Sequence, residues 1–230
     1  MSLLEKEGVL PLLENWTDKD ARLAPHLDDL EILYLMIRER KSKIVLEFGI
    51  GYSTLVIAAA LKKNLLEWDG ITRPFKADFN FFRCYVVEAN NNGSWASGTM
   101  KNIALKTTLD NIIVTTCPVM VGTFREMICH YYTKIPNILP DFIYLDGPDP
   151  KDANGNIRGI HFNHPETLPM AADLLFLEPI LLPDTTILID GRQANARFLR
   201  RNFQRLWEYG MSDATDMSWM TLRERPLNEP

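Results

Sequence analysis

Three acidic side chains stand at the ends of short apolar runs, where they could bind a positively charged ligand. Glu47, Glu88 and Asp146 each follow residues rich in β-branched or aromatic side chains. Runs of this kind predict buried parallel strands, and ligands of open α/β sheets bind outside the carboxyl ends of the strands. We therefore expect the three carboxylates at one edge of a sheet, which would suit a cation and repel phosphate groups.

A pair of glycines follows the first of these carboxylates. Residues 44–47 predict a strand, and Gly49 and Gly51 predict a tight turn before an apolar helix. Glycine allows the positive φ angles of a sharp turn and lacks the Cβ atom that would keep a ligand away. Ser53 or Thr54 can cap the helix by accepting a hydrogen bond from a backbone N–H group. The turn is a candidate cofactor site, and a purely structural turn is the alternative.

The residues around the glycine turn distinguish two kinds of cofactor. A dinucleotide-binding turn has the pattern G-x-G-x-x-G/A, but Thr54 stands at the third glycine position here. The carboxylate of Glu47 would repel a pyrophosphate and suits a cationic ligand with an amino group. The pattern therefore favours a cofactor of that kind, and a nicotinamide-dependent oxidoreductase is kept as an alternative.

These stretches resemble the class I S-adenosylmethionine-dependent methyltransferases. Glu47-x-Gly49-x-Gly51-x-Ser53-Thr54 is similar to motif I of that family, and Asp146-Gly147-Pro148 is similar to its motif IV. The resemblance covers roughly residues 40–222. It implies that the glycine turn passes under the methionine part of the cofactor, that Glu88 binds the ribose hydroxyls and that Val119 borders the adenine. The cofactor-binding residues that it implies are Glu47, Gly49, Gly51, Ser53, Thr54, Glu88, Val119 and Asp146.

A narrower resemblance concerns a metal ion. Catechol-type O-methyltransferases hold a divalent cation with an Asp after the fourth strand and an Asp-Asn pair after the fifth. This chain has Asp146 and Asp190 at the matching places, but Gly191 stands where the Asn would be. Two carboxylates with waters could still hold Mg²⁺, which would acidify an acceptor hydroxyl. Metal dependence through Asp146 and Asp190 and metal-free transfer are both left open.

The acceptor side of the site is expected after the fourth strand. Residues 149–165 form a long polar segment that would overhang it, since long loops in compact domains are usually functional or disordered. His161 there could supply a general base or a metal ligand, or be a solvated loop residue. Asp146, His161 and Asp190 are the candidate catalytic residues. The Asn/Asp-Pro-Pro-Tyr/Phe motif typical of N-methyltransferases is absent at Asp146, which favours a hydroxyl oxygen of a small molecule or sugar-type acceptor.

The order of the apolar runs predicts the elements that position these residues. We expect an α/β fold, a Rossmann-like doubly wound sheet of about seven strands, mostly parallel, with helices on both faces. The resemblance implies an antiparallel C-terminal hairpin. Residues 1–40 would form a helical lead-in and residues 41–230 the cofactor-binding methyltransferase domain, as one compact unit. The expected strands are residues 44–47, 83–87, 111–116, 140–145, 185–189, 207–211 and 218–222.

Apolar residues at three- and four-residue spacing predict the helices. One or two short helices are expected before residue 27, and an irregular insertion is expected at residues 66–81, which contain turn signals. The expected longer helices are residues 27–41, 54–65, 94–109, 124–132, 165–182 and 196–206.

The composition narrows the class of protein. With 230 residues, 46% of them hydrophobic and 24% charged, the chain is typical of one soluble globular domain. The net charge of −5 argues against a general nucleic-acid-binding surface. No apolar run is long enough to span a bilayer, and residues 1–8 do not read as a signal peptide. The three cysteines lack C-x-x-C spacing, which favours reduced thiols in a cytoplasmic protein.

Three functions follow from these patterns. The main expectation is an S-adenosylmethionine-dependent methyltransferase that acts on a small-molecule acceptor, without nucleic acid or membrane as partner. The second is the nicotinamide-dependent oxidoreductase, and the third is a non-catalytic protein that keeps the cofactor pocket as an assembly or regulatory module. Aminopropyl transfer on the same fold is a minor fourth reading, because that family's aspartate-rich glycine signature is absent. The oligomeric state is not indicated.

Overall fold

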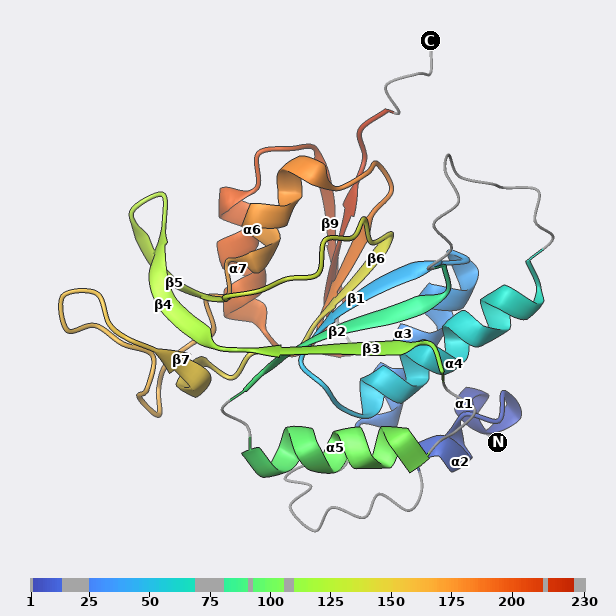
Figure 1. Ribbon diagram of the computed structural model, residues 1–230. Coiled ribbons are helices and arrows are strands. Elements are labelled where there is room, and N and C mark those ends of the chain that lie inside the picture. Colours follow the sequence, from blue (N-terminus) through green and yellow to red (C-terminus); the bar gives the residue numbers. More distant parts are fainter. Residues whose placement is uncertain are drawn as a thin grey trace.

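A seven-stranded sheet forms the centre of the molecule (Figure 1). The computed structural model describes residues 2–13, 25–68, 81–90, 93–105, 110–212 and 215–225. The strand order is β3-β2-β1-β6-β8-β10-β9, in which β10 runs antiparallel to both its neighbours and the other pairs are parallel. This confirms the expected doubly wound sheet and its C-terminal hairpin. The strands are β1 (Ile44–Phe48), β2 (Arg83–Ala89), β3 (Ile112–Cys117), β6 (Phe142–Leu145), β8 (Thr186–Ile189), β9 (Trp207–Met211) and β10 (Ser218–Leu222).

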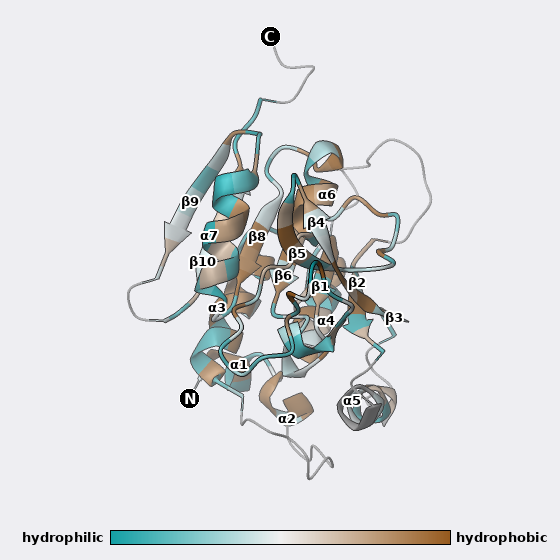
Figure 2. Cartoon of the chain, turned by 90° about the vertical axis from the view of Figure 1, so that its left-hand side faces the viewer, coloured by the Kyte–Doolittle hydropathy of each residue, from teal (hydrophilic) through white to brown (hydrophobic). Residues whose placement is uncertain are grey.

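The central strands are apolar because both faces of the sheet are covered, as parallel sheets require. Figure 2 shows hydrophobic colour along β6 and β8, and all four residues of each are buried. The register pairs Phe48 with both Val87 and Leu145, and pairs Leu145 with Ile189. The turns that follow β1, β2, β6 and β8 therefore begin at the same edge of the sheet.

Helices cover the two faces unequally. On one face α3 (Leu27–Glu39) and α4 (Tyr52–Leu66) pack against each other, with α1 (Leu3–Lys6) and α2 (Leu10–Leu13) beside them. On the other face lie α6 (Asp173–Leu177), the 3₁₀ turn η2 (Glu178–Ile180) and α7 (Gln193–Asn202). Helix α5 (Gly93–Leu105) lies below the sheet in Figure 1. None of the described helices has the length and apolar character that a membrane span requires.

The helix expected at residues 124–132 is wrong, because a β-hairpin occupies this part of the chain. Its strands are β4 (Val119–Phe124) and β5 (Met127–Tyr132), and a third strand, β7 (Ala153–Asn154), pairs with β4. The two turn residues have positive φ angles, 47° at Arg125 and 68° at Glu126. Such turns normally contain Asn or Gly, so the sequence carried no hairpin signal here.

The helix expected at residues 165–182 is also wrong over most of its length. Residues 170–172 are not helical because their backbone bonds to that of His130, whose N–H group donates to the carbonyl of Met170 and whose carbonyl accepts from the N–H group of Ala172. The N–H group of Met170 also donates to Nε2 of His130 at 3.0 Å. Helix α6 begins only after these bonds. Within the expected irregular segments, residues 150–152 form the 3₁₀ turn η1 (Pro150–Asp152), whereas residues 69–80 lie outside the described residues. The last residues of the helix expected at 94–109, residues 106–109, also lie outside them.

Candidate functional site

The turns that follow β1 and β6 are packed against each other at the carboxyl edge of the sheet. Gly49 has a φ angle of +96°, which favours glycine, and its N–H group donates to the carbonyl of Val87 at 2.9 Å. The N–H group of Asp146 donates to the carbonyl of Phe48 at 3.1 Å. A Cβ atom at Gly147 would lie 2.7 Å from the Cα atom of Gly49. The two turns thus meet backbone to backbone, and this contact requires glycine.

The helix after the first turn starts at Tyr52 and is capped differently from the expectation. Gly51 is the N-cap residue, and its N–H group donates to Oγ1 of Thr54 at 3.1 Å. Ser53 and Thr54 are both buried inside the first turn of α4, so neither is the N-cap that the sequence predicted. A Cβ atom at Gly51 would meet only Oγ of Ser53, at 3.7 Å, among the described residues. The space beside Gly51 is therefore open to a ligand.

Glu47 lies beneath the glycine turn and is completely buried. Its Oε1 accepts a hydrogen bond from Oγ of Ser53 at 2.5 Å, and Oε2 is 3.7 Å from Sγ of Cys84. Burial raises the pKa of Glu47 to about 8, while the hydrogen bonds from Ser53 and Thr54 oppose the rise. The carboxyl group is therefore mostly protonated at neutral pH. Glu47 therefore fastens the end of β1 to the first turn of α4 through Ser53, and it is not a negatively charged surface group.

Glu88 lies at the end of β2, next to the glycine turn. Its side chain is almost fully buried, and Oε2 accepts a hydrogen bond from the N–H group of Ile50 at 2.7 Å. The carboxylate is thus bonded to the turn that the sequence predicts as the cofactor site. Glu88 therefore combines a fixed position with an acceptor role.

Tyr132 completes this part of the edge, and the sequence did not indicate it. Its ring stacks on Phe48 with centroids 5.8 Å apart. The hydroxyl is buried and has no hydrogen-bond partner among the described residues. Burial, followed by the charge of Glu88, raises the pKa of Tyr132 well above its usual value. An unpaired buried hydroxyl usually has a water or ligand as partner, so Tyr132 marks polar space near Glu88.

Arg192 holds the turn that contains Asp146. Its Nε donates to the carbonyl of Asp146 and its Nη2 to the carbonyl of Pro148, both at 2.7 Å. The Asp146 side chain reaches solvent, yet loss of hydration among the surrounding protein atoms raises its pKa to about 6. The positive charge of Arg192 opposes this rise, and the negative charges of Asp190 and Asp216 add to it. The carboxyl group is therefore largely ionised at pH 7, yet more basic than an ordinary aspartate.

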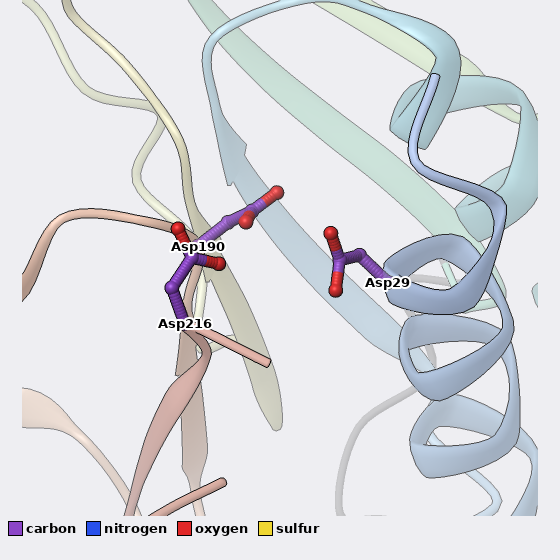
Figure 3. Close-up of side chains that lie close together, drawn as sticks. All are labelled: Asp29, Asp190 and Asp216. Carbon is purple, nitrogen blue, oxygen red and sulfur yellow. The ribbon is translucent and has the colours of Figure 1, made fainter. Parts of the chain in front are cut away.

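A second acidic group lies beside this edge. Carboxylate oxygens of Asp29, Asp190 and Asp216 lie within 4.8 Å of one another. Figure 3 shows Asp190 and Asp216 side by side, with Asp29 facing them from α3. Burial is the main cause of the raised pKa values of Asp29 and Asp190, and neighbouring carboxylates add to both. The hydroxyl of Tyr144 donates a hydrogen bond to Asp190, which opposes the rise there.

This group bears on the metal site that the sequence predicts. Among the described residues, the carboxylates close enough to share an ion with Asp190 are Asp29 and Asp216, and Asp146 is not in the group. Gly191 has a φ angle of +59°, and a Cβ atom there would lie 3.0 Å from Oδ2 of Asp216. Asp216 thus fills the space of the side chain that Gly191 lacks. The donor set consists of the hard oxygen atoms that Mg²⁺ prefers.

His161 and Val119 are the two remaining predicted site residues. His161 is exposed, and its Nδ1 accepts a hydrogen bond from the N–H group of Asn163 at 3.2 Å within a local turn. Val119 is completely buried at the start of β4, and its carbonyl accepts from Nδ2 of Asn154 at 3.1 Å. Among the described residues, no hydrogen bond or ion pair joins His161 to Asp146 or Asp190. The structure thus gathers the glycine turn, Glu88 and Asp146. Val119 pairs with Tyr132 of the same edge, and His161 lies in an exposed turn.

The residues that sequence reasoning missed come from segments far apart in the chain. Arg192 could have been noticed, since it follows Asp190 by two positions. The other missed residues lie in segments whose contacts with the edge arise only from folding, and they are Asp29, Tyr132, Tyr144 and Asp216.

No family model matches the sequence, and the comparison with curated proteins finds no match. Solved structures do resemble it. The chain aligns over 94% of its length with 88% of the methyltransferase PaMTH1 of Podospora anserina, a SAH-bound structure, at 13% identity and a TM-score of 0.57. A Staphylococcus aureus protein described as a caffeoyl-CoA O-methyltransferase aligns along its full length with 96% of the chain, at 14% identity and a TM-score of 0.50. A methyltransferase from Geobacter sulfurreducens aligns over 90% of its length with 94% of the chain, at 11% identity and a TM-score of 0.50.

Proposed function

From the class I methyltransferase fold that the chain adopts, we propose that it is an S-adenosylmethionine-dependent methyltransferase that acts on a hydroxyl oxygen of a small molecule. One observation carries the proposal: the Gly49–Gly51 turn, Glu88 and the turn at Asp146 meet at the carboxyl edge of the sheet. The SAH bound to PaMTH1 supports the choice of cofactor. The description of the Staphylococcus aureus protein supports an oxygen acceptor.

The residues at this edge suit the parts of the cofactor. The open space beside Gly51 would take the methionine part, and the Glu88 carboxylate would accept hydrogen bonds from the ribose hydroxyls. We keep Val119 as the neighbour of the adenine on the resemblance alone. Bound S-adenosylmethionine supplies an activated methyl group, and the protein orients donor and acceptor.

Asp146 is the proposed general base of the reaction. Its carboxyl group, with a pKa of about 6, is ionised at neutral pH and can accept the proton of an acceptor hydroxyl. Asp190, whose position is fixed by Tyr144, would orient that hydroxyl. His161 remains a candidate only if its exposed turn closes over the edge.

A metal-assisted version of the proposal uses the same edge. Asp190, which the sequence predicts as a ligand together with Asp146, would hold Mg²⁺ with Asp29 and Asp216, the described carboxylates close enough to share an ion with it. The ion would lower the pKa of an acceptor hydroxyl. Asp190→Ala should then lower the affinity for Mn²⁺ measured by electron paramagnetic resonance, which reports on the site without any turnover.

The test is calorimetric titration with S-adenosylmethionine, S-adenosylhomocysteine and NAD, each with and without Mg²⁺. We expect micromolar binding of the first two and none of NAD. Binding of NAD alone would replace the methyltransferase by an oxidoreductase. Tight binding of S-adenosylmethionine without transfer to any of a panel of hydroxylated acceptors would favour the non-catalytic alternative.

A further inference from the structure

An apolar hollow lies between helix α3 and the C-terminal strands. Its volume is about 330 Å³, within the range of pockets that bind small molecules. Helix α3 and strands β8 and β10 supply most of its walls, and the remaining wall comes from the segment between β9 and β10. The lining residues are Ile32, Met36, Leu188, Ser212, Thr215, Met217 and Trp219.

The acidic group of Figure 3 comes from the same segments that line this hollow. Asp29 precedes Ile32 by three positions on α3, so the two side chains share a helix face. Leu188 lies in β8 and Asp190 directly follows that strand. The two residues are two positions apart, so they point to the same side of the sheet. Asp216 directly precedes Met217, another lining residue. The hollow is therefore apolar along its walls and negatively charged where β8 ends.

The charges at this end are unbalanced. Asp29, Asp190 and Asp216 face one another, and among the described residues the positive groups that lower the pKa of Asp29 or Asp190 are His26 and Arg192. Arg192 is already bonded to the carbonyls of the turn at Asp146, and His26 is exposed at the start of α3. Close carboxylates disfavour each other's ionised form, so a ligand cation between them would relieve this repulsion.

We propose that the methyl acceptor carries an ammonium group besides its hydroxyl, and that the hollow binds it as an amphipathic amine. Its apolar body would lie against Ile32, Met36 and Trp219, and its ammonium group would lie beside Asp29 and Asp216. Charge complementarity selects this occupant, because an ammonium group forms charge-assisted hydrogen bonds with carboxylates and an anion would be repelled. The inference rests on the proposed function, since Asp190 ends the strand next to the one that Asp146 follows. The acceptor would then lie beside the cofactor edge.

Three probes of similar size and different charge test the assignment. We would titrate the full chain with 2-phenylethylamine, 2-phenylethanol and 3-phenylpropanoate at pH 7, with binding followed by calorimetry and ligand-observed NMR. The amine should bind at least about tenfold more tightly than the alcohol, as expected for one or two charge-assisted hydrogen bonds. The propanoate should not bind. Equal affinities for amine and alcohol, or no binding of the amine, would overturn the proposal.

Substitutions locate the amine. The double change Asp29→Asn and Asp216→Asn should remove the preference for the amine and leave alcohol binding unchanged. Asp28→Asn is the matched control, because Asp28 is an exposed carboxylate in the same helix turn and should change neither affinity. Ile32→Trp should weaken both the amine and the alcohol by filling the hollow, and its circular dichroism spectrum and melting temperature should match the wild type. An amine preference that survives the double change would refute the site.

Two further measurements separate this inference from neighbouring ones. Each titration is repeated with S-adenosylhomocysteine present, so that absence of cofactor binding is distinguished from absence of amine binding. Mg²⁺ is then added in place of the amine. Tight Mg²⁺ binding that excludes 2-phenylethylamine and is lost in the double variant would reassign the acidic group to a metal and overturn the amine.

Discussion

At the scale of single residues, Glu47 and Glu88 have different chemistry although they lie on neighbouring strands. Glu47 faces α4, is fully buried and bonds to Ser53, so its pKa rises to about 8. Glu88 accepts a hydrogen bond from the backbone of the glycine turn. Burial without a cation favours the neutral form of the Glu47 carboxyl group. Glu47 therefore stabilises the turn through its bond to Ser53, and we propose Glu88 as the acceptor for the ribose hydroxyls.

The ribose role of Glu88 predicts a specific loss of affinity. Glu88→Gln should weaken the binding of S-adenosylhomocysteine by about 1–3 kcal/mol, since hydrogen bonds to a charged acceptor are replaced by neutral ones. Calorimetry measures the change, and Glu126→Gln, an exposed acid in the hairpin turn, is the control. Wild-type affinity in Glu88→Gln would remove Glu88 from the cofactor site.

The proposed base predicts a pH profile. A general base must be deprotonated to act, so kcat/KM should rise with pH through about 6, the pKa of Asp146, and then level off. Asp146→Asn should lower kcat strongly while S-adenosylhomocysteine affinity changes little. A flat profile between pH 5 and pH 8 in the wild type would exclude Asp146 as the base.

The buried Glu47 predicts how stability depends on pH. Its pKa is about 8 in the folded chain and about 4.3 in the unfolded chain, so the folded state holds an extra proton between these values. Stability should therefore fall as pH rises through this window, by up to about 1.4 kcal/mol per pH unit. Denaturant unfolding of Glu47→Gln, which cannot ionise, should show a weaker pH dependence than the wild type. Parallel curves would contradict the buried, uncompensated carboxyl group.

At the scale of elements, the β4–β5 hairpin occupies the part of the chain where a helix was expected. Its base packs into the same core as β1 and α6, and Phe124 and Tyr131 contact Phe176 edge to face, with centroids 5.4 Å and 5.6 Å apart. The hairpin also carries Tyr132 to the cofactor edge and His130 to the segment before α6. This one element therefore shapes both the edge of the site and the path of the long loop.

The hairpin turn predicts a stabilising substitution. Arg125 and Glu126 have positive φ angles, which cost about 1–2 kcal/mol for each ordinary residue. Replacing them by Asn and Gly, the residues that such turns prefer, should raise the free energy of unfolding by about 1 kcal/mol or more. Glu126→Gln is the control, since it keeps the strained backbone and should leave stability unchanged. Equal stability of the double variant would show that the turn is not strained.

At the scale of the whole molecule, the site is a meeting of strand ends that are distant in sequence. The turn after β1 touches the turn after β6, Arg192 after β8 holds that second turn, and Asp29 from α3 faces Asp190. None of these contacts is local. Their geometry depends on the parallel register of the central strands, which brings all of these ends to one level.

This dependence predicts that one methyl group between two turns affects both folding and binding. Gly147→Ala should destabilise the protein by about 1–3 kcal/mol through overpacking, because its Cβ would lie 2.7 Å from the Cα of Gly49. The substitution should also weaken the binding of S-adenosylhomocysteine, since the turn at Gly49 must shift. Gly159→Ala, at a positive φ with open space around it, is the control. It should cost stability alone, and an equal loss of affinity in both variants would contradict the prediction.

The sequence by itself determined the sheet and the local turns. Central strands such as residues 142–145 are continuous apolar runs because they are buried on both faces, and the glycine turn is readable because few other residues allow its backbone. These signals are local, so they survive without the rest of the fold. The seven strands and the carboxylates at their ends could therefore be predicted.

Only the tertiary structure decided the hairpin, the non-helical residues before α6 and the surroundings of each carboxylate. The hairpin turn lacks Asn and Gly, and residues 170–172 are not helical because they bond to His130, 40 positions earlier in the chain. Whether Glu47 is neutral, or Asp190 lies beside Asp29 and Asp216, depends on which side of the sheet each strand end faces. Burial and the proximity of other charges decide the chemistry of a carboxylate, and both arise only when distant segments pack together.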